Sequence, residues 1–305
     1  MNNTKLFRSE FLNPKYWVIW IGIAFARMVC FLPLTLRWQF GTWLGNIAYG
    51  LARKRRHIVE TNIRLCFPQM SDSDARKLVK ENFRSSGIAI TETALAWFVN
   101  PGKFNHIVDI DGLEKLRQAK SERKGVLLLG MHLSSLDFCG AALAHIEPFD
   151  VIYRKNKNQL FESIMKIGRE RNFENVIERQ NIREVIRRLK KGAIVWYGPD
   201  QDYGPKHSVF TDFFGVKAAT LTATARIIRM TGAQVIVFSH YRDLVTGRYQ
   251  INLYKLEGNY PMGDDLADAM KVNQVIEDAV RQAPEQYWWL HRRFKTRPLD
   301  QDKLY

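Results

Sequence analysis

The most regular hydrophobic pattern in the chain lies between residues 71 and 98. Ser71 followed by Asp74 is typical of a helix start, because a serine hydroxyl accepts a hydrogen bond from a backbone amide of the first turn. After this start, apolar side chains recur every three or four residues from Ala75 to Trp97. That spacing places them on one face of a helix. The pattern therefore predicts one long amphipathic helix over residues 71–98.

Downstream of this helix, short apolar runs alternate with amphipathic segments. The runs predict strands at residues 107–110, 126–129, 150–153, 193–197, 234–239 and 249–254, the last two pairing across a turn near Gly247. The other segments predict helices at residues 112–120, 159–171, 182–191, 220–230, 264–281 and 285–294, with one more after residue 133. Alternating strands and helices form an α/β fold, a mixed and mostly parallel sheet with helices on both faces. We predict this fold for residues 69–305, and a separate N-terminal region over residues 1–68.

The N-terminal region contains two apolar stretches, residues 16–36 and 41–52. As a helix the first would be about 31 Å long, close to the hydrocarbon thickness of a bilayer. Arg27 in its middle and Pro33 near its end count against a clean span. Three interpretations remain open: a single membrane-anchoring helix, two apolar helices embedded in one leaflet, or a buried helical hairpin.

The second apolar stretch ends in the basic run RKRR, residues 53–56, and the whole chain has a formal net charge of +15. A charge of this size indicates an acidic partner, such as anionic lipid, an acidic protein, a phosphorylated substrate or a nucleic acid. Beside an apolar segment, the run is best explained by anionic lipid headgroups, and it favours a cytoplasmic location for the rest of the chain. The three cysteines have neither metal-ligand nor disulfide spacing, so no metal site is predicted.

Candidate catalytic chemistry follows the strand at residues 126–129. His132 comes directly after this strand, and Asp137 comes five residues later. The two side chains can meet if His132 lies in the turn and Asp137 in the first turn of the next helix, with Ser134 or Ser135 as its N-cap. The pair would then be a general base with an orienting carboxylate. The alternative is a chance spacing in which Asp137 only caps backbone amides.

Two other predicted strands also end in polar side chains. Arg154 follows the strand at 150–153, and Asp200 and Asp202 follow the strand at 193–197. Because the carboxyl ends of parallel strands meet at one edge of a sheet, these residues can line one cleft with the imidazole. The guanidinium of Arg154 suits a phosphate group, or it forms a structural ion pair with one of the two aspartates. Both interpretations remain open.

The segment HLSSLD, residues 132–137, matches the HxxxxD motif of the glycerolipid and lipid A acyltransferases. Longer segments resemble the secondary acyltransferases of lipid A biosynthesis, most of all their lauroyl and palmitoleoyl branch. These segments are NPKYWVIW (13–20), NIRLCFPQMS (62–71), VWYGPDQDYGPKHSVF (195–210) and APEQYWWLHRRFKTRP (283–298). The resemblance covers nearly the whole chain and implies a glycerolipid-acyltransferase-like fold.

The resemblance also implies an activity. A fatty acyl chain would move from acyl-carrier-protein to the hydroxyl of a 3-hydroxyacyl chain on the phosphorylated, Kdo-bearing lipid A precursor. The enzyme would need no cofactor and would act at the cytoplasmic face of the bacterial inner membrane, held by a single N-terminal anchor. His132 would deprotonate the acceptor hydroxyl, with Asp137, where this branch often has glutamate, orienting the imidazole.

The family pattern carries over to other residues unevenly. Arg154 matches the arginine that ends the second strand of the superfamily, so we expect it to bind substrate. The glycerolipid relatives carry an EGTR block that this chain lacks, so Asp200 and Asp202 are substrate-binding candidates from their position alone. Arg292 and Arg293 are further candidates, because basic and aromatic residues alternate around them as at the headgroup level of a membrane. A solvated basic tail is the alternative for this segment.

Other functions fit parts of the pattern. An acyl thioesterase could use the same histidine to activate water, and a glycerolipid acyltransferase could use it on another acceptor. A membrane-tethered nucleic-acid-binding protein would explain the basic charge, but it leaves His132 and Asp137 without a role. The chain also lacks the aromatic stacking motifs of RNA-binding modules. We therefore expect no nucleic-acid partner.

Overall fold

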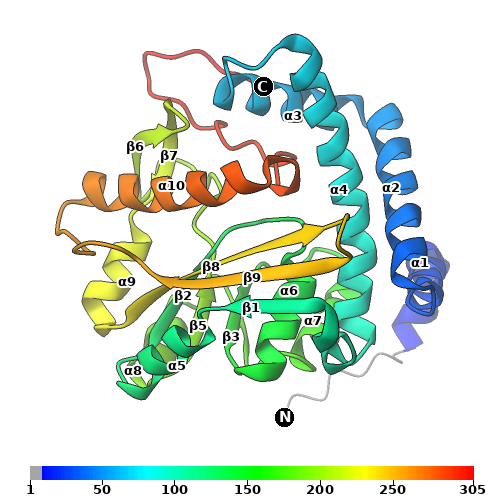
Figure 1. Cartoon of the computed structure of the whole chain (residues 1–305), viewed down its shortest axis with the longest axis horizontal. Coiled ribbons are helices and arrows are strands. Elements are labelled where there is room, and N and C mark those ends of the chain that lie inside the picture. Colours follow the sequence, from blue (N-terminus) through cyan, green and yellow to red (C-terminus); the bar gives the residue numbers. More distant parts are fainter. Residues whose placement is uncertain (1–8) are drawn as a thin grey trace.

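The structure is a computed structural model that describes residues 9–305, and a seven-stranded sheet forms its centre (Figure 1). The strands are β1 (Val108–Asp111), β2 (Val126–Gly130), β3 (Asp150–Tyr153), β4 (Val176–Glu178), β5 (Ile194–Tyr197), β8 (Gln234–Asp243) and β9 (Arg248–Lys255). Their order is β1-β9-β8-β2-β5-β3-β4. Every neighbouring pair is parallel except β8 and β9. The predicted mixed, mostly parallel α/β sheet is therefore confirmed.

Helices cover both faces of this sheet, as the pattern predicted. They are α4 (Asp72–Phe98), α5 (Leu113–Ser121), α6 (Leu136–Ile146), α7 (Gln159–Glu170), α8 (Ile182–Lys190), α9 (Ala223–Thr231) and α10 (Asp265–Gln282). Because side chains alternate along a strand, neighbouring residues of the central strand β2 enter different cores. Leu128 packs in one cluster with Phe138 of α6, and Leu129 packs in another with Val272 of α10.

The long helix α4 begins as predicted. The Ser71 hydroxyl accepts a hydrogen bond from the backbone N–H of Asp74 at 3.1 Å. Farther along, α4 lies against α2 (Leu34–Leu51) at a contact made by three glycines. A Cβ atom added to Gly87 would lie 2.1 Å from the carbonyl oxygen of Gly41 and 2.5 Å from the backbone nitrogen of Gly45. The two helix backbones therefore touch, and no side chain fits between them.

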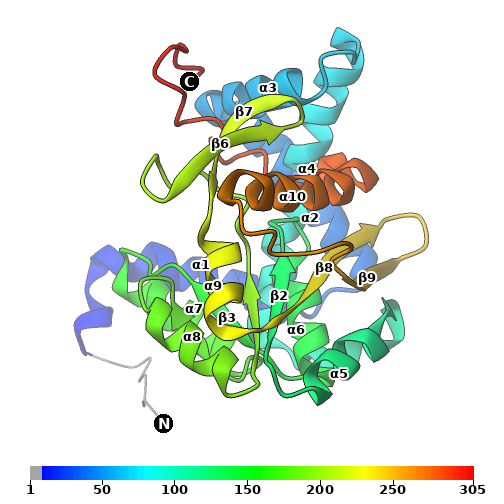
Figure 2. The same cartoon turned by 90° about the vertical axis from the view of Figure 1, so that its left-hand side faces the viewer.

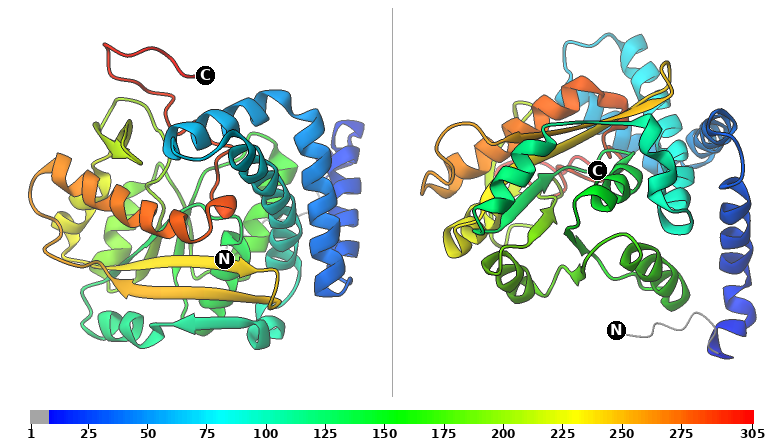
Figure 3. Two further views of the ribbon diagram at one scale, coloured as in Figure 1. Left: turned by 45° about the horizontal axis from the view of Figure 1, so that its top comes forward. Right: turned by 60° about the horizontal axis from the view of Figure 1, so that its bottom comes forward.

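The predicted single anchoring helix is wrong, because the apolar stretch 16–36 is divided between two helices. α1 (Trp17–Val29) ends before Pro33, which is the N-cap of α2, and the basic run begins α3 (Arg53–Cys66). No helix of residues 9–305 is both long enough and apolar enough to cross a membrane. α1 is the outermost helix beside α2 and α4 (Figure 3). Val18 and Ile21 on α1 are 79% and 70% exposed, so the buried-hairpin interpretation is also wrong.

α3 contributes Val59 and Ile63 to the same core as α4 and α10. α3, at the end of the N-terminal region, thus packs directly on the α/β unit. The domain boundary at Pro68 stays a prediction. Two 3₁₀ helices precede α1, at Ser9–Leu12 and Pro14–Tyr16, and a third, Pro101–Ile107, leads into β1.

Besides β4 and α3, which lie where no strand or helix was predicted, two segments differ from the predicted secondary structure. The first is an antiparallel hairpin, β6 (Ser208–Phe213) and β7 (Val216–Leu221), which occupies the start of the helix predicted at 220–230. α10 lies between this hairpin and the large sheet (Figure 2). The second is the predicted helix at 285–294. After a short 3₁₀ turn, Pro284–Gln286, this segment runs without helix and Tyr287 forms a β-bridge with Leu133.

The C-terminal segment is not helical because its backbone groups bond to other parts of the chain. The side-chain amide of Asn82 on α4 donates to the carbonyls of Glu285 and Tyr287, at 2.9 and 2.7 Å. The N–H of Trp288 donates to the carbonyl of His132 at 2.9 Å. These tertiary hydrogen bonds replace those of a helix and attach the segment to the turn after β2.

Candidate active site

The turn after β2 carries His132, and the loop after β5 carries Asp200. β5 lies next to β2 in the sheet and runs parallel to it, so the ends of the two strands bring these residues together, as predicted. The imidazole Nδ1 lies 2.6 Å from Oδ1 of Asp200. The other carboxylate oxygen, Oδ2, accepts the backbone N–H of His132 at 2.8 Å. One buried carboxylate therefore holds both the ring and the backbone of the histidine.

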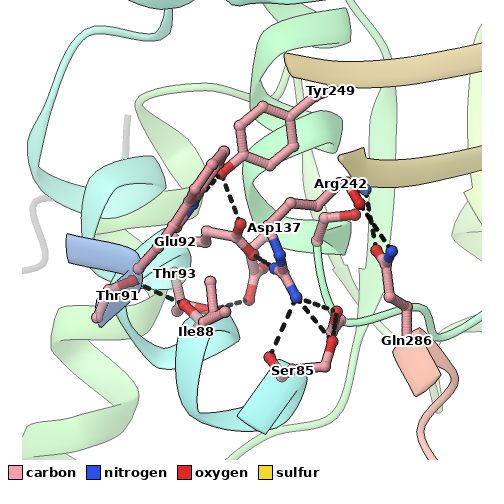
Figure 4. Close-up of polar contacts among 12 residues, drawn as sticks. Ser85, Ile88, Thr91, Glu92, Thr93, Asp137, Arg242, Tyr249 and Gln286 are labelled. Atoms are coloured by element: carbon pink, nitrogen blue, oxygen red, sulfur yellow. Dashed lines mark hydrogen bonds and ion pairs between the residues drawn. The ribbon is translucent and has the colours of Figure 1, made fainter. Parts of the chain in front are cut away.

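Asp137 lies in the first turn of α6, as predicted, but its carboxylate makes other contacts than expected. Oδ2 accepts the hydroxyl of Thr93 on α4 at 3.0 Å, and Oδ1 accepts Nη2 of Arg169 on α7 at 3.3 Å (Figure 4 shows the contact with Thr93). The orienting hydrogen bond to the imidazole thus comes from Asp200 and not from Asp137. The physical reason is direction: Nδ1 and the backbone N–H of His132 face the β5 loop, whereas Asp137 lies between α4 and α7.

Ser135 is at the N-cap position of α6, as predicted, but its hydroxyl does not cap the helix. It lies 2.8 Å from Nδ1 of His240 on β8. Ser134 bonds to the hydroxyl of Ser85 on α4 at 2.7 Å. The two serines of the motif therefore bond the turn to α4 and to β8.

Burial and charge act in opposite directions on the imidazole. Burial and, to a smaller extent, Arg169 lower the pKa of His132. The adjacent Asp200 carboxylate and, to a smaller extent, Asp137 raise it, and the resulting pKa is above its ordinary value. Burial works against ionisation of Asp200, yet the histidine holds the pKa of that carboxyl below its usual range. His240 and His291 carry no such stabilised charge, because burial lowers their pKa values to about 3 and about 4.

A cavity of about 1200 Å³ opens in front of His132. It exceeds the range of about 300–1,000 Å³ that is usual for small-molecule pockets. Most of its lining is apolar and comes from several helices, including Ile23 of α1, Ile90 and Trp97 of α4, and Phe161 of α7. The polar side chains that line it include His132, Asp137, Arg154, Arg169, Arg179 and Lys206. The cavity suits a long apolar ligand whose reactive group lies beside the imidazole.

The remaining predicted site residues divide into two groups. Arg154 is exposed and lines the cavity, and it does not pair with either aspartate, since Asp200 bonds to His132. Asp202 is buried away from the cavity, where its carboxylate accepts the N–H and the hydroxyl of Thr296 at 2.6 and 2.8 Å. Asp202 therefore anchors the C-terminal segment.

Arg292 and Arg293 also separate. Arg292 is exposed, with its guanidinium over the ring of Tyr305. Arg293 is buried and donates to the carbonyl of Ala219 at 2.8 Å and to the hydroxyl of Thr220 at 3.1 Å. Its neighbours Trp289 and Phe294 are fully buried as well. The structure places Arg293 in the core and leaves Arg292 on the surface.

Some residues near the histidine were missed by the sequence analysis. Arg169 lies within a predicted helix and had no distinguishing pattern. Glu92 on α4 and Arg242 on β8 form a buried ion pair behind the turn, with Nη1 and Oε2 2.7 Å apart. Glu92 is two residues from both Ile90 and Ala94 of the predicted apolar face, which places it on the opposite side of the helix 71–98, so the pattern did not single it out. Nothing local pointed to its partner.

Comparison with known proteins identifies similar chains. A family model described as bacterial lipid A biosynthesis acyltransferase matches residues 4–296. Lipid A biosynthesis lauroyltransferase from Escherichia coli K12 is 38% identical over 299 residues, covering 98% of both chains. Lipid A biosynthesis palmitoleoyltransferase from the same organism is 37% identical over 300 residues, again covering 98% of both. The solved structure of the 1-acyl-sn-glycerophosphate (LPA) acyltransferase PlsC from Thermotoga maritima matches 82% of this chain and 95% of its own at 17% identity, with a TM-score of 0.36.

Proposed function

The chain belongs to the bacterial lipid A biosynthesis acyltransferases, and we propose that it acylates the hydroxyl of a 3-hydroxyacyl chain on the Kdo-bearing lipid A precursor. The acyl donor in this proposal is a thioester of acyl-carrier-protein, and no cofactor takes part. The observation that carries the proposal is the contact of His132 with buried Asp200 at the head of a large apolar cavity. An oriented base beside space for a long chain is what acyl transfer to a lipid alcohol requires.

The contact with Asp200 assigns the two ring nitrogens of His132. Nδ1 donates to the carboxylate, so Nε2 is the nitrogen that accepts a proton. Nε2 takes the proton of the acceptor hydroxyl while the hydroxyl oxygen attacks the thioester carbonyl carbon. The C–S bond then breaks, the ester forms, and the imidazolium returns the proton to the leaving thiolate. A positioned base of this kind contributes about 10²–10⁴ in rate.

Charge near the cavity supports the same reaction. Asp200 stabilises the imidazolium formed in the first step, because the pair is buried and hydrogen-bonded. The carbonyl oxygen gains negative charge as the tetrahedral intermediate forms. Arg169 lines the cavity and is held by Asp137, so it is a fixed cation available to stabilise that oxygen. In this proposal Asp137 acts through Arg169.

We also propose that α1 and α2 lie in one leaflet of the inner membrane, with the rest of the chain on its cytoplasmic side. Exposed apolar side chains line α1, and Ile19 and Ile23 of the same helix line the cavity. A lipid chain could then pass from the leaflet into the cavity without crossing water. The basic run at 53–56 suits anionic headgroups next to this surface.

The product of the reaction tests the proposal against its rivals. Purified protein in detergent micelles would receive an acyl-carrier-protein thioester and the Kdo-bearing precursor, with products read by mass spectrometry. The proposal predicts a precursor heavier by one acyl group. Free fatty acid with unchanged precursor would identify a thioesterase, and acylation of a lysophospholipid alone would identify a glycerolipid acyltransferase.

A further inference from the structure

Arg242 of β8 and Glu92 of α4 form an ion pair (Figure 4), and Arg242 contacts the turn that carries His132 through Ser134. The two side chains are 2% and 1% exposed. Nη2 of Arg242 donates to the hydroxyls of Ser85 at 2.7 Å and Ser134 at 3.2 Å. Ser134 is two residues from the histidine, so the guanidinium contacts the catalytic turn itself.

The backbone of Arg242 supports the same turn through the C-terminal segment. Its N–H donates to Oε1 of Gln286 at 2.9 Å, and its carbonyl accepts Nε2 of the same side chain at 2.9 Å. The carbonyl of Gln286 in turn accepts the N–H of Ser134 at 2.7 Å. Ser134 is thus held at its hydroxyl and at its amide by two routes that both begin at Arg242.

A second side chain of β8 holds the next residue of the turn. His240 and Arg242 are two positions apart and so lie on the same face of the strand. His240 bonds to Ser135, and Arg242 bonds to Ser134. The two serines of HLSSLD are therefore matched, one each, by two buried side chains of the neighbouring strand.

Stability alone does not explain this pair. Taking two charges out of water is costly, and apolar residues of similar volume often stabilise a fold as well as a buried ion pair does. What an ion pair adds is direction, because Arg242 can donate to several acceptors in a fixed plane. Glu92 keeps that plane in place, since its other oxygen accepts the hydroxyl of Tyr249 on β9 at 2.6 Å.

We propose that Arg242 and Glu92 are positioning residues that fix the HLSSLD turn, so that His132 keeps its contact with Asp200 and its Nε2 toward the cavity. This inference rests on the proposed acyl transfer. Neither side chain is among those that line the cavity. Their effect reaches the reaction only through the placement of the turn, and small displacements of a reacting group, about 1 Å, cost about 10² in rate.

The test uses two variants that leave the net charge of the protein unchanged. Glu92→Met/Arg242→Met replaces the ion pair by apolar side chains, and Ser85→Ala/Ser134→Ala removes only the two hydroxyls that Arg242 contacts. Both are compared with Asp268→Asn. Asp268 is an equally buried carboxylate that is paired with Arg229 on α9 and does not line the cavity. Each protein is measured for thermal unfolding and for acyl transfer as a function of pH.

For both double variants we expect kcat to fall about 10–100-fold, with KM for the donor nearly unchanged. The acid limb of the kcat profile should move to lower pH, because His132 loses the carboxylate contact that raises its pKa. Asp268→Asn should lower the unfolding temperature and leave kcat and the profile of the folded protein as in wild type. If the methionine variant does not fold, the serine variant decides.

Folded double variants with the kcat and pH profile of wild type would overturn the positioning role. The positioning role would also be overturned if kcat fell in Asp268→Asn as well, and by an amount that follows the loss of stability in all three variants. Wild-type protein that acylates no lipid precursor would instead refute the proposed function, so the two failures are distinguishable.

Discussion

Both carboxylate oxygens of Asp200 contact His132, one at the ring Nδ1 and the other at the backbone N–H, at 2.6 and 2.8 Å. The two contacts together fix the tautomer of the imidazole and the direction in which its ring leaves the turn. Tyr287 adds a third constraint, because its hydroxyl donates to the carbonyl of Asp200 at 3.3 Å. The imidazole is therefore oriented by the loop after β5 and by the C-terminal segment.

We expect Asp200→Asn to lower kcat for acyl transfer by about 10²–10⁴, since the amide cannot stabilise the imidazolium and favours the other tautomer. Asp268→Asn is the matched control, because Asp268 is as buried but pairs with Arg229 and does not line the cavity. The control should lose stability and keep its turnover. Equal turnover in the two variants, measured at a temperature where both are folded, would contradict the role of Asp200.

The activity of wild-type protein should rise with pH through the raised pKa of His132, above the usual histidine value of about 6.5. Only the neutral imidazole can accept the proton. In Asp200→Asn the acid limb should shift to lower pH, because the carboxylate that raises the pKa is gone and burial lowers it. A pH–kcat profile of each protein measures this difference. If the acid limbs of wild type and Asp200→Asn lay at the same pH, the predicted effect of Asp200 on the pKa of His132 would be wrong.

The same pair gives stability a pH dependence of definite sign. Because the pKa of His132 is raised in the folded protein, its contribution to the free energy of unfolding is fully present below the unfolded pKa of about 6.5. The contribution is lost as pH rises through the folded pKa. Thermal unfolding of wild type and His132→Gln should therefore differ more at pH 6 than at pH 9. A difference that grows toward alkaline pH would refute this assignment.

Asp137 and Arg169 should act as one unit, because each is a partner of the other beside the cavity. We expect Asp137→Ala and Arg169→Ala each to lower kcat/KM, and the double variant to be little worse than the poorer single one. Steady-state kinetics of the three proteins gives the coupling. Losses that multiply in the double variant would show that the two side chains act independently.

The proposed contact of α1 with the membrane can be tested by substitutions on its exposed face, which leave the core unchanged. Val18→Asp/Ile21→Asp places two charges on its exposed apolar face, where a charge inside hydrocarbon costs about 2.5–3.5 kcal/mol. We expect this variant to lose most of its binding to anionic vesicles in a sedimentation assay. Met270→Asp, at an exposed methionine of α10, is the control and should bind as wild type does. Unchanged binding of the α1 variant would exclude this helix as the contact.

The glycine contact between α2 and α4 leads to a stability prediction. Gly87→Ala should destabilise the protein by about 1–3 kcal/mol or more, because its Cβ would lie 2.1 Å from the carbonyl of Gly41. Gly50→Ala on the same α2 meets nothing within 4 Å and should be neutral or slightly stabilising. Thermal unfolding compares the two variants. Equal unfolding temperatures would be inconsistent with backbone contact between the helices.

Features with a local cause were predictable from the sequence. The strand β2 follows from a run of apolar residues, and the helix α4 follows from apolar residues at helical spacing. Each of these signals lies within one segment of the chain. Asp200 was recognised as a strand-end residue, but its partner depends on β5 lying beside β2, and sequence position does not reveal strand order. The pair of Glu92 and Arg242 joins residues 150 positions apart, so no local pattern could indicate it.

The C-terminal segment shows how tertiary contacts override a local pattern. Its basic and aromatic residues predicted a helix at a membrane surface. The structure instead has Trp289 and Phe294 in the core and the backbone of Tyr287 and Trp288 bonded to α4 and to the turn of His132. Competition between intrahelical and tertiary hydrogen bonds is decided by residues far away in the chain.

The most direct test compares wild-type protein with His132→Ala, each incubated with an acyl-carrier-protein thioester and the Kdo-bearing lipid A precursor. Mass spectrometry of the lipid reads the mass added, and thermal unfolding confirms that the variant is folded. We predict one added acyl group with wild type and none with the variant. An acylated precursor formed at a near-wild-type rate by folded His132→Ala would contradict the account.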